Sequence, residues 1–164
     1  MGKTYTSEKE YVDALEIFLI KNGFKVWREV VPDRCKNWDQ PWRVDLIAYH
    51  LDVGYIGVEA KNMNTLRSGG KIAGAIEQLK RYRGETYFDG INIDNWSLGC
   101  PHQDFNDGLR DLNLFLSYFL GYYNLLFLEF EENRIVLGKN SKSTLYISDK
   151  ISGSLVKNKL EEWF

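Results

Sequence analysis

Two neighbouring stretches decide the fold: Trp42-Arg43-Val44-Asp45-Leu46-Ile47-Ala48-Tyr49 and Gly54-Tyr55-Ile56-Gly57-Val58-Glu59-Ala60-Lys61. Both are apolar enough to form strands, and the turn residues Asp52-Val53-Gly54 between them predict a hairpin. Side chains two positions apart on a strand point to the same face, so Glu59 and Lys61 share a face. The hairpin brings Asp45 towards Glu59 from the neighbouring strand.

Two carboxylates beside a lysine suit the hydrolysis of a phosphodiester with a divalent metal. Magnesium keeps several waters and needs only one or two carboxylates when a substrate phosphate supplies further oxygens. A lysine adds positive charge near the transition state or orients the attacking water. The alternative is an ordinary salt bridge between Glu59 and Lys61 on the surface. Asp45 favours the catalytic interpretation, because a buried carboxylate with neither partner nor metal is costly.

Predicted helices lie on both sides of this hairpin. Ser7 followed by Glu10 forms a capping box, apolar residues then recur at helical spacing from Tyr11 to Leu19, and Gly23 ends the helix. Glu8 falls on the core-facing side of this helix, although uncertainty in the helix phase leaves Glu10 as an alternative. After a Ser68-Gly69-Gly70 loop, the spacing predicts a second helix over Lys71 to Arg83, on which Gln78 and Tyr82 are neighbours.

The order of these elements resembles the PD-(D/E)XK nuclease superfamily. The elements that carry the resemblance are Glu8, Val44-Asp45, Glu59-Ala60-Lys61 and Gln78-Leu79-Lys80-Arg81-Tyr82. The Gln-x-x-x-Tyr element is similar to RecB-type nuclease domains, and the first helix is similar to that of Holliday-junction resolvases. The match covers about the first hundred residues. Val44 stands where the family name has proline, a position that supplies no catalytic group.

The resemblance implies roles for these residues. Asp45 and Glu59 would bind Mg²⁺, with Mn²⁺ as a substitute, and Glu8 would be an outer carboxylate of the metal site. Lys61 would contact the scissile phosphate or the attacking water, and Gln78 would position the substrate or the lysine. Two cysteines, Cys35 and Cys100, are too few for an iron–sulfur cluster or a structural zinc site, so we expect neither group and two free thiols.

The resemblance implies an α/β fold, a restriction-endonuclease-like αβββαβ core with a mixed central sheet flanked by helices. We expect a strand over Asn95 to Cys100, and then an added C-terminal helix from about Phe105 to Leu120 that Gly121 stops. A buried strand from Asn124 to Phe130 and a hairpin into Arg134-Ile135-Val136-Leu137 follow. The tail from Ser152 to Phe164 is expected to form a short helix that covers the core or the sheet edge.

Length and composition predict a single domain over residues 1–164, with a core over about 5–100 and an extension over about 101–164. The N-terminus lacks the apolar segment of a signal peptide, which together with the free thiols predicts a cytoplasmic protein. Polar residues interrupt the apolar stretch from Leu112 to Phe130, so we expect no membrane association.

The charge is low for a nucleic-acid-binding protein, at −2 with a pI of about 5.7. Basic residues nevertheless flank the proposed site, although they could be ordinary solvated charges. The predicted nucleic-acid contacts are Arg43, Arg67, Lys71, Arg81 and Tyr82. Trp38 and Trp42 could stack on unpaired bases; packing against the first helix is the favoured alternative.

These features lead to a metal-dependent nuclease that hydrolyses phosphodiester bonds in DNA, although the sequence does not distinguish DNA from RNA. The low charge predicts that a partner protein or a second copy of the chain supplies part of the affinity. One alternative is a non-catalytic module of the same fold that binds nucleic acid or protein. Another is an unrelated α/β interaction domain with structural acids, which the position of Gln78 and Tyr82 disfavours.

Overall fold

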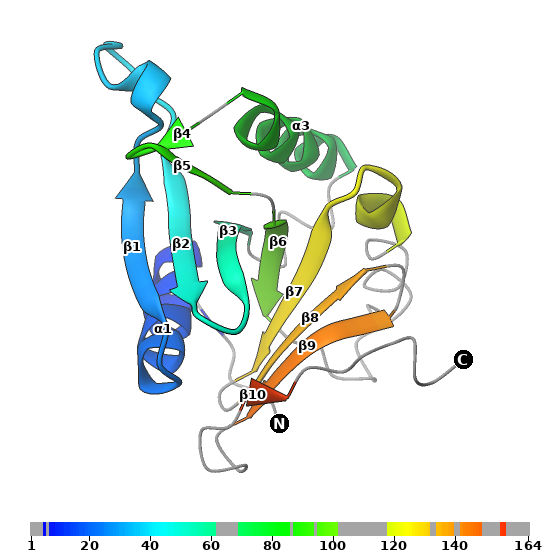
Figure 1. Ribbon diagram of the computed structural model, residues 1–164. Helices are drawn as coiled ribbons and strands as arrows, with labels where there is room; N and C mark the ends of the chain where they lie inside the picture. Colours follow the sequence, from blue (N-terminus) through cyan, green and yellow to red (C-terminus); the bar gives the residue numbers. More distant parts are fainter. Residues whose placement is uncertain are drawn as a thin grey trace.

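The computed structural model describes residues 5, 7–61, 69–85, 87–93, 95–101, 118–131, 134–139, 142–148 and 155–156 (Figure 1). In these ranges the chain forms an eight-stranded sheet with helices on both faces. The predicted α/β class, with a mixed central sheet flanked by helices, is confirmed.

Helix α1 (Glu8–Lys21) begins and ends where its sequence predicts. The Ser7 hydroxyl accepts a hydrogen bond from the Glu10 backbone N–H at 3.1 Å, which caps the first turn. Asn22 is the C-cap, and Gly23 follows with φ of 85°, in the left-handed region that glycine adopts without strain. The apolar side chains that recur along the helix are buried, namely Tyr11, Val12, Leu15, Phe18 and Leu19.

Strands β1 (Lys25–Val30), β2 (Val44–His50) and β3 (Gly54–Ala60) form an antiparallel meander. The predicted hairpin between β2 and β3 is confirmed. Its turn closes with a bond from the Val53 N–H to the His50 carbonyl, and Gly54 has φ of 85°. Lys61 is the first residue beyond β3, and its N–H donates to the Gly99 carbonyl at 2.9 Å. This bond ties the end of β3 to the neighbouring strand.

The sheet continues through β6 (Asn95–Pro101), β7 (Leu126–Glu131), β8 (Arg134–Lys139), β9 (Lys142–Ser148) and β10 (Leu155–Val156). Its order is β1-β2-β3-β6-β7-β8-β9-β10. Strand β6 is parallel to both β3 and β7, whereas the remaining neighbours are antiparallel. The predicted strand at Asn95 to Cys100 and the predicted hairpin of β7 and β8 are confirmed.

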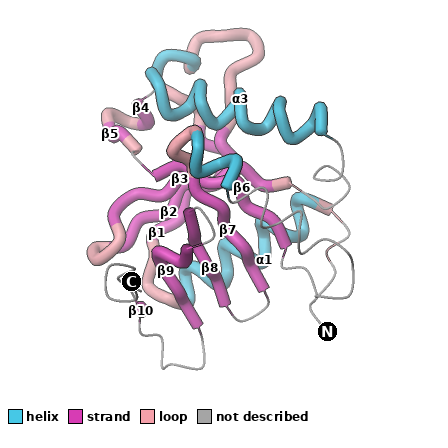
Figure 2. Tube along the Cα trace, turned by 90° about the vertical axis from the view of Figure 1, so that its right-hand side faces the viewer, coloured by secondary structure: helices cyan, strands magenta, loops and turns pink. Residues whose placement is uncertain are grey.

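Helices α1 and α3 (Gly69–Glu85) lie on opposite faces of the sheet (Figure 2). The core on the α1 side includes Leu15, Leu46, Val58 and Phe130. The core on the α3 side includes Ile47, Leu79, Trp96 and Phe127. The Tyr11 hydroxyl also donates to the Cys100 carbonyl at 3.0 Å, which fixes α1 against β6.

A small outlying unit covers the edge of the α3 face near β1 and β2. It contains the 3₁₀ helix η1 (Asp33–Cys35) and the two-stranded sheet of β4 (Tyr87–Phe88) and β5 (Ile91–Asn92). The Asp33 carboxylate accepts hydrogen bonds from the backbone N–H groups of Asp89 and Gly90 at 2.9 and 2.8 Å. These bonds join η1 to the turn between β4 and β5.

Some predicted elements end or fold differently. The helix after residue 118 continues through Gly121 to Tyr122, and its end is set by Asn124, whose φ is 59°. The earlier part of this predicted helix, up to residue 117, lies outside the described residues. Leu155 and Val156 pair with β9 as a strand, so the predicted tail helix is wrong there; the rest of the tail is not described.

Cys35 and Cys100 are buried and free, as predicted. Within the described ranges, no helix has the length and apolar character needed to cross a membrane.

Candidate active site

Asp45 and Glu59 lie side by side where β2 begins and β3 ends. The register pairs Leu46 with Val58, so one further step along both strands sets Asp45 opposite Glu59. The Ala60 N–H donates to Oδ2 of Asp45 at 2.8 Å and thereby holds the aspartate against β3. The hairpin therefore brings the two carboxylates together, as its sequence predicts.

Lys61 completes the group. Its Nζ donates to Oε1 of Glu59 at 2.8 Å, and the Glu59 side chain is only 4% exposed. The other oxygen of this carboxylate, Oε2, is buried and has no hydrogen-bond partner among the described residues. A buried carboxylate oxygen without a partner is costly, so this oxygen is available to a ligand.

The pKa values of these three groups depend on one another. Burial, reinforced by the negative charge of Asp45, raises the pKa of Glu59 to about 7, although Lys61 opposes the shift. Burial also raises the pKa of Asp45, while the hydrogen bond from Ala60 lowers it. Burial lowers the pKa of Lys61, but the charge and hydrogen bond of Glu59 more than compensate, so this pKa lies above its ordinary value. With a pKa of about 7, the Glu59 carboxyl is only partly protonated near neutral pH, and a bound cation would favour its charged form.

Glu8 lies within electrostatic range of this group. Its carboxylate in the first turn of α1 contributes to the raised pKa values of Asp45, Glu59 and Lys61. Glu10, the alternative acid on the same helix, is not among the leading influences on these groups. Of the two acids, Glu8 therefore has the larger electrostatic influence on the group, and its role as an outer carboxylate stays a prediction.

Glu29 is a further acid near Asp45 that sequence reasoning missed. The pairs of Arg28 with Leu46 and Val30 with Val44 bracket Glu29 and Asp45. Glu29 has φ of 52°, an uncommon backbone conformation for a residue other than glycine, and its charge raises the pKa of Asp45. No sequence signal marks this residue, because an exposed glutamate in an edge strand is ordinary.

The strands are irregular at this point. Residues two apart share a face in a regular strand, yet Val44 packs in the α3-side core and Leu46 in the α1-side core. The left-handed Glu29 lies opposite this part of β2, between the pairs of Arg28 with Leu46 and Val30 with Val44.

Gln78 and Tyr82 on α3 form a hydrogen-bonded chain beside the acids. Gln78 Nε2 donates to the Tyr82 hydroxyl at 2.7 Å, and that hydroxyl donates to the Arg43 carbonyl at 3.0 Å. Burial, followed by the charge of Glu59, raises the pKa of Tyr82 well above its ordinary range. The chain of bonds fixes the backbone at Arg43, two residues before Asp45.

The residues predicted to contact nucleic acid differ in how exposed they are to solvent. Arg43, Lys71 and Arg81 are exposed, whereas Arg67 lies outside the described residues. Tyr82 is only 2% exposed, and its contact with nucleic acid stays a prediction. Tyr82 became buried because its ring packs between Trp42 and Trp96, at centroid distances of 6.3 and 5.4 Å.

Trp38 and Trp42 do not follow the expected packing against the first helix. Their rings meet edge to face at 5.4 Å, and Trp42 packs against the α3-side core through Tyr82. This difference arises because the loop after η1 crosses the α3 face of the sheet, opposite α1. The alternative role, stacking on unpaired bases, stays a prediction.

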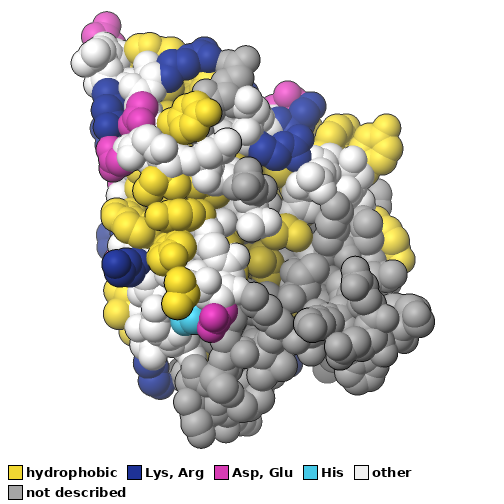
Figure 3. Space-filling view, viewed as in Figure 1, with side chains coloured by type: hydrophobic (Ala, Val, Ile, Leu, Met, Phe, Trp, Pro, Cys, Tyr) yellow, Lys and Arg dark blue, Asp and Glu magenta, His cyan; other side chains and the backbone are white. Residues whose placement is uncertain are grey.

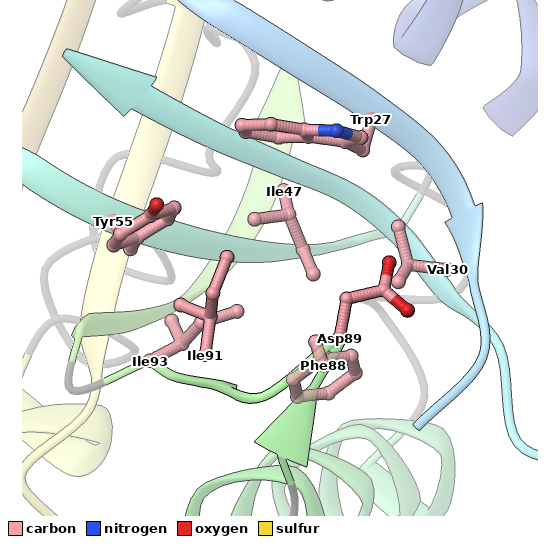
Figure 4. A pocket seen from close by; sticks show the side chains of 8 residues that line it. All are labelled: Trp27, Val30, Ile47, Tyr55, Phe88, Asp89, Ile91 and Ile93. Atoms are coloured by element: carbon pink, nitrogen blue, oxygen red, sulfur yellow. The ribbon is translucent and has the colours of Figure 1, made fainter. Parts of the chain in front are cut away.

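A hollow of about 120 Å³ lies elsewhere on the α3 face, between the strands and the β4–β5 unit (Figure 4). It is lined by Trp27, Val30, Ile47, Tyr55, Phe88, Asp89, Ile91 and Ile93. Its one acid, Asp89, pairs with Lys36 at 2.8 Å. Most of these side chains are apolar, and the predicted site residues that the structure describes do not line the hollow.

The two carboxylates of Asp45 and Glu59 suit a metal that takes few ligands from the protein, such as magnesium. They are too few for a metal whose ligands all come from protein side chains. Among the residues that the structure describes, no group of three or more His, Cys, Asp or Glu side chains could hold a metal ion. Two carboxylates, one with an unpartnered oxygen, match the partial protein coordination that magnesium uses when water and phosphate complete its shell.

No protein-family model and no curated protein matches the chain. A crystal structure of an XisH family protein from Nostoc punctiforme is similar to it, with a TM-score of 0.42 and 15% sequence identity. The match covers 73% of this chain and 89% of that chain.

Proposed function

We propose that this chain is a metal-dependent nuclease of the PD-(D/E)XK type that hydrolyses phosphodiester bonds in DNA. The observation that carries the proposal is the group of Asp45, Glu59 and Lys61, in which Oε2 of Glu59 is buried without a hydrogen-bond partner among the described residues. This arrangement leaves Oε2 of Glu59 available to a metal ion, beside the positive charge of Lys61. The resemblance in element order supports a restriction-endonuclease-like core.

Each residue has a role in this proposal. Asp45 and Glu59 hold Mg²⁺ or Mn²⁺, and Glu8 adds negative charge at the outer side of the metal site. Lys61 keeps its positive charge near the reacting phosphate or orients the attacking water. Gln78 and Tyr82 hold the Arg43 backbone and thereby position the start of β2. When bound, the metal lowers the pKa of a coordinated water and stabilises charge on the phosphoryl oxygens.

The test is cleavage of supercoiled plasmid and of single-stranded DNA with Mg²⁺ or Mn²⁺, and then with a chelator. We expect cleavage that requires the metal and falls at least about a hundredfold in Asp45→Asn and in Glu59→Gln. The matched control is Asp52→Asn on the same hairpin, which is 65% exposed. This control should cleave as the wild type does.

Two results would count against the proposal. Cleavage that persists in chelator, or in both site variants, would exclude the metal mechanism. An absence of cleavage on every DNA and RNA substrate and metal would instead favour the non-catalytic binding module.

A further inference from the structure

A second hollow, larger and more open, lies on the surface beside α3. Its volume is about 470 Å³, and it is lined by Arg34, Trp42, Lys80, Arg81 and Gly84. We call it the Trp42 hollow. It shares no lining residue with the apolar hollow under β4 and β5. Figure 3 shows Lys and Arg side chains gathered over α3 on this face of the molecule.

The Trp42 hollow combines cations with an aromatic ring. The Arg81 guanidinium lies 5.1 Å from the centroid of the Trp42 ring, and the Arg34 guanidinium lies 5.9 Å from it. Arg34 also lies 5.7 Å from the ring of Trp38, which is 41% exposed. Flat guanidinium and indole groups are the surfaces on which unpaired nucleic-acid bases stack.

The charge of the Trp42 hollow contrasts with that of the whole chain. Among the described residues its lining carries Arg34, Lys80 and Arg81 and no acid, whereas the chain has a net charge of −2. Lys80 also pairs with Glu77 at 3.0 Å. A positive hollow on an acidic protein favours a negatively charged ligand such as a phosphate-bearing nucleotide.

One residue that lines the Trp42 hollow is close in the chain to the acid group. Trp42 precedes Asp45 by three residues, a separation of at most about 11 Å along the chain. The Trp42 ring packs on Tyr82, whose hydroxyl binds the Arg43 carbonyl. A nucleotide held in this hollow would therefore lie within one or a few nucleotides of a phosphate at Asp45 and Glu59.

We infer that the Trp42 hollow binds one nucleotide of an unpaired DNA strand, with the base stacked on Trp42 or on its flanking guanidinium groups and the phosphate beside Arg34, Lys80 and Arg81. This inference rests on the proposed nuclease function and specifies its substrate as DNA with single-stranded character. A paired base offers its faces to its neighbours in the helix, so a blunt duplex does not supply this contact.

The test is binding of fluorescent oligothymidine, about 15 nucleotides long, to the full chain in the presence of chelator. We expect Trp42→Ala to weaken binding roughly five- to hundredfold, the range measured for the loss of one base–aromatic stack. Trp42→Phe should retain most of the affinity, because a phenyl ring still stacks, but should lose the quenching of Trp42 fluorescence. Trp27→Ala is the matched control, since Trp27 is 39% exposed and lines the other hollow.

Charge variants test the phosphate contact without removing a packed ring. Arg34 and Arg81 are exposed, so Arg34→Ala and Arg81→Ala should fold as the wild type does. Each should lower the slope of log affinity against log salt by about 0.7 if its side chain contacts a phosphate. Lys25→Ala is the control, because Lys25 pairs with Tyr49 at the opposite end of β1 and β2.

The strand preference is tested by competition. A blunt duplex should compete poorly, and oligouridine should show whether the strand must be DNA. Equal affinity for duplex and single strand, or unchanged binding in Trp42→Ala, would overturn the inference.

The two proposals fail differently. Asp45→Asn should still bind oligothymidine, because binding in chelator does not require cleavage. If the protein binds oligothymidine but cleaves no substrate, the proposal of nucleotide binding in the Trp42 hollow stands and the nuclease proposal fails. Metal-dependent cleavage with unchanged binding in Trp42→Ala would do the reverse.

Discussion

Lys61 holds one oxygen of Glu59 at 2.8 Å while the second oxygen of the same carboxylate stays buried and without a hydrogen-bond partner in the described part of the chain. The pair is therefore only half satisfied by the protein. Burial makes the charged form of Glu59 costly, and Asp45 adds to that cost. A bound cation would relieve both contributions, and the first three predictions follow from this situation.

Replacing Lys61 with methionine should raise the pKa of Glu59 further, because the substitution removes the nearby positive charge that lowers it. We expect cleavage at neutral pH to fall at least about a hundredfold. Cleavage rates measured between pH 6 and 9 test this prediction. Lys9→Met is the control, since Lys9 is 80% exposed and pairs with Asp13 at the surface. Normal cleavage in Lys61→Met would remove this lysine from the mechanism.

The stability of the metal-free protein should fall as pH rises from about 4.5 to about 7. The folded pKa of Glu59 is about 7 against an ordinary value of 4.5, so in this window the folded state binds more protons than the unfolded state. The loss is on the order of 3 kcal/mol when the window has been crossed. Urea unfolding in chelator at several pH values measures it. Glu59→Gln should show a smaller loss than wild type, whereas Glu77→Gln should not differ from wild type.

Divalent metal should stabilise the folded protein, and more strongly as pH rises through about 7. The carboxylates must lose their protons to bind the ion, and at a hundred times the dissociation constant the gain is about 2.7 kcal/mol. Thermal unfolding with and without Mg²⁺ or Mn²⁺ tests this expectation. Asp45→Asn should lose the effect, and an equal gain in that variant would place the ion elsewhere.

Gly57→Ala should destabilise the protein severely. Gly57 pairs with Trp96 on β6, and a Cβ added at Gly57 would lie 2.2 Å from the Trp96 ring, which is itself 1% exposed and cannot retreat. We expect a loss of about 3 kcal/mol or more in unfolding free energy. Gly74→Ala in α3 is the matched control, because nothing lies within 4 Å of its added Cβ. That helical substitution should be neutral or stabilising by up to about 1 kcal/mol.

Tyr82→Phe should cost about 1–3 kcal/mol of stability, because the Arg43 carbonyl and Gln78 Nε2 lose a partner in a partly buried place. It should also slow cleavage, since the bond to Arg43 fixes the chain two residues before Asp45. Urea unfolding and cleavage rates separate the two effects. Tyr87→Phe is the control, because Tyr87 is 55% exposed. Unchanged cleavage in Tyr82→Phe would limit this hydroxyl to a structural role.

Local patterns were sufficient to predict the elements that build the candidate site. Helical spacing from Tyr11 to Leu19 and the Ser7 cap specified α1, and the glycine turn specified the β2–β3 hairpin. The proximity of Asp45 to Glu59 follows from that hairpin alone. These features depend on residues close in the sequence, so the chain reveals them without knowledge of its tertiary contacts.

Other features depend on contacts between distant segments. The burial of Tyr82 results from Trp42 and Trp96, which precede and follow it in the chain by 40 and 14 residues. Leu155 pairs with Ile147 in a strand, where the spacing of apolar residues in the tail predicts a helix. Glu29 adopts a left-handed conformation, but the sequence does not predict it, because the residue at this position is neither glycine nor asparagine. Periodicity within one segment carries no information on such contacts.

The position of β6 has a consequence for how the chain folds. Strands β1 to β3 and β7 to β10 are joined by local antiparallel ladders, whereas β6 unites these two groups through parallel pairing on both sides. In parallel pairing a long crossover must lose conformational entropy before the hydrogen bonds between the strands form. Parallel pairing therefore makes folding slow. We therefore expect docking of β6 to limit the folding rate. Substitutions at the Gly57–Trp96 contact would then slow refolding, whereas substitutions confined to the β2–β3 turn would chiefly accelerate unfolding.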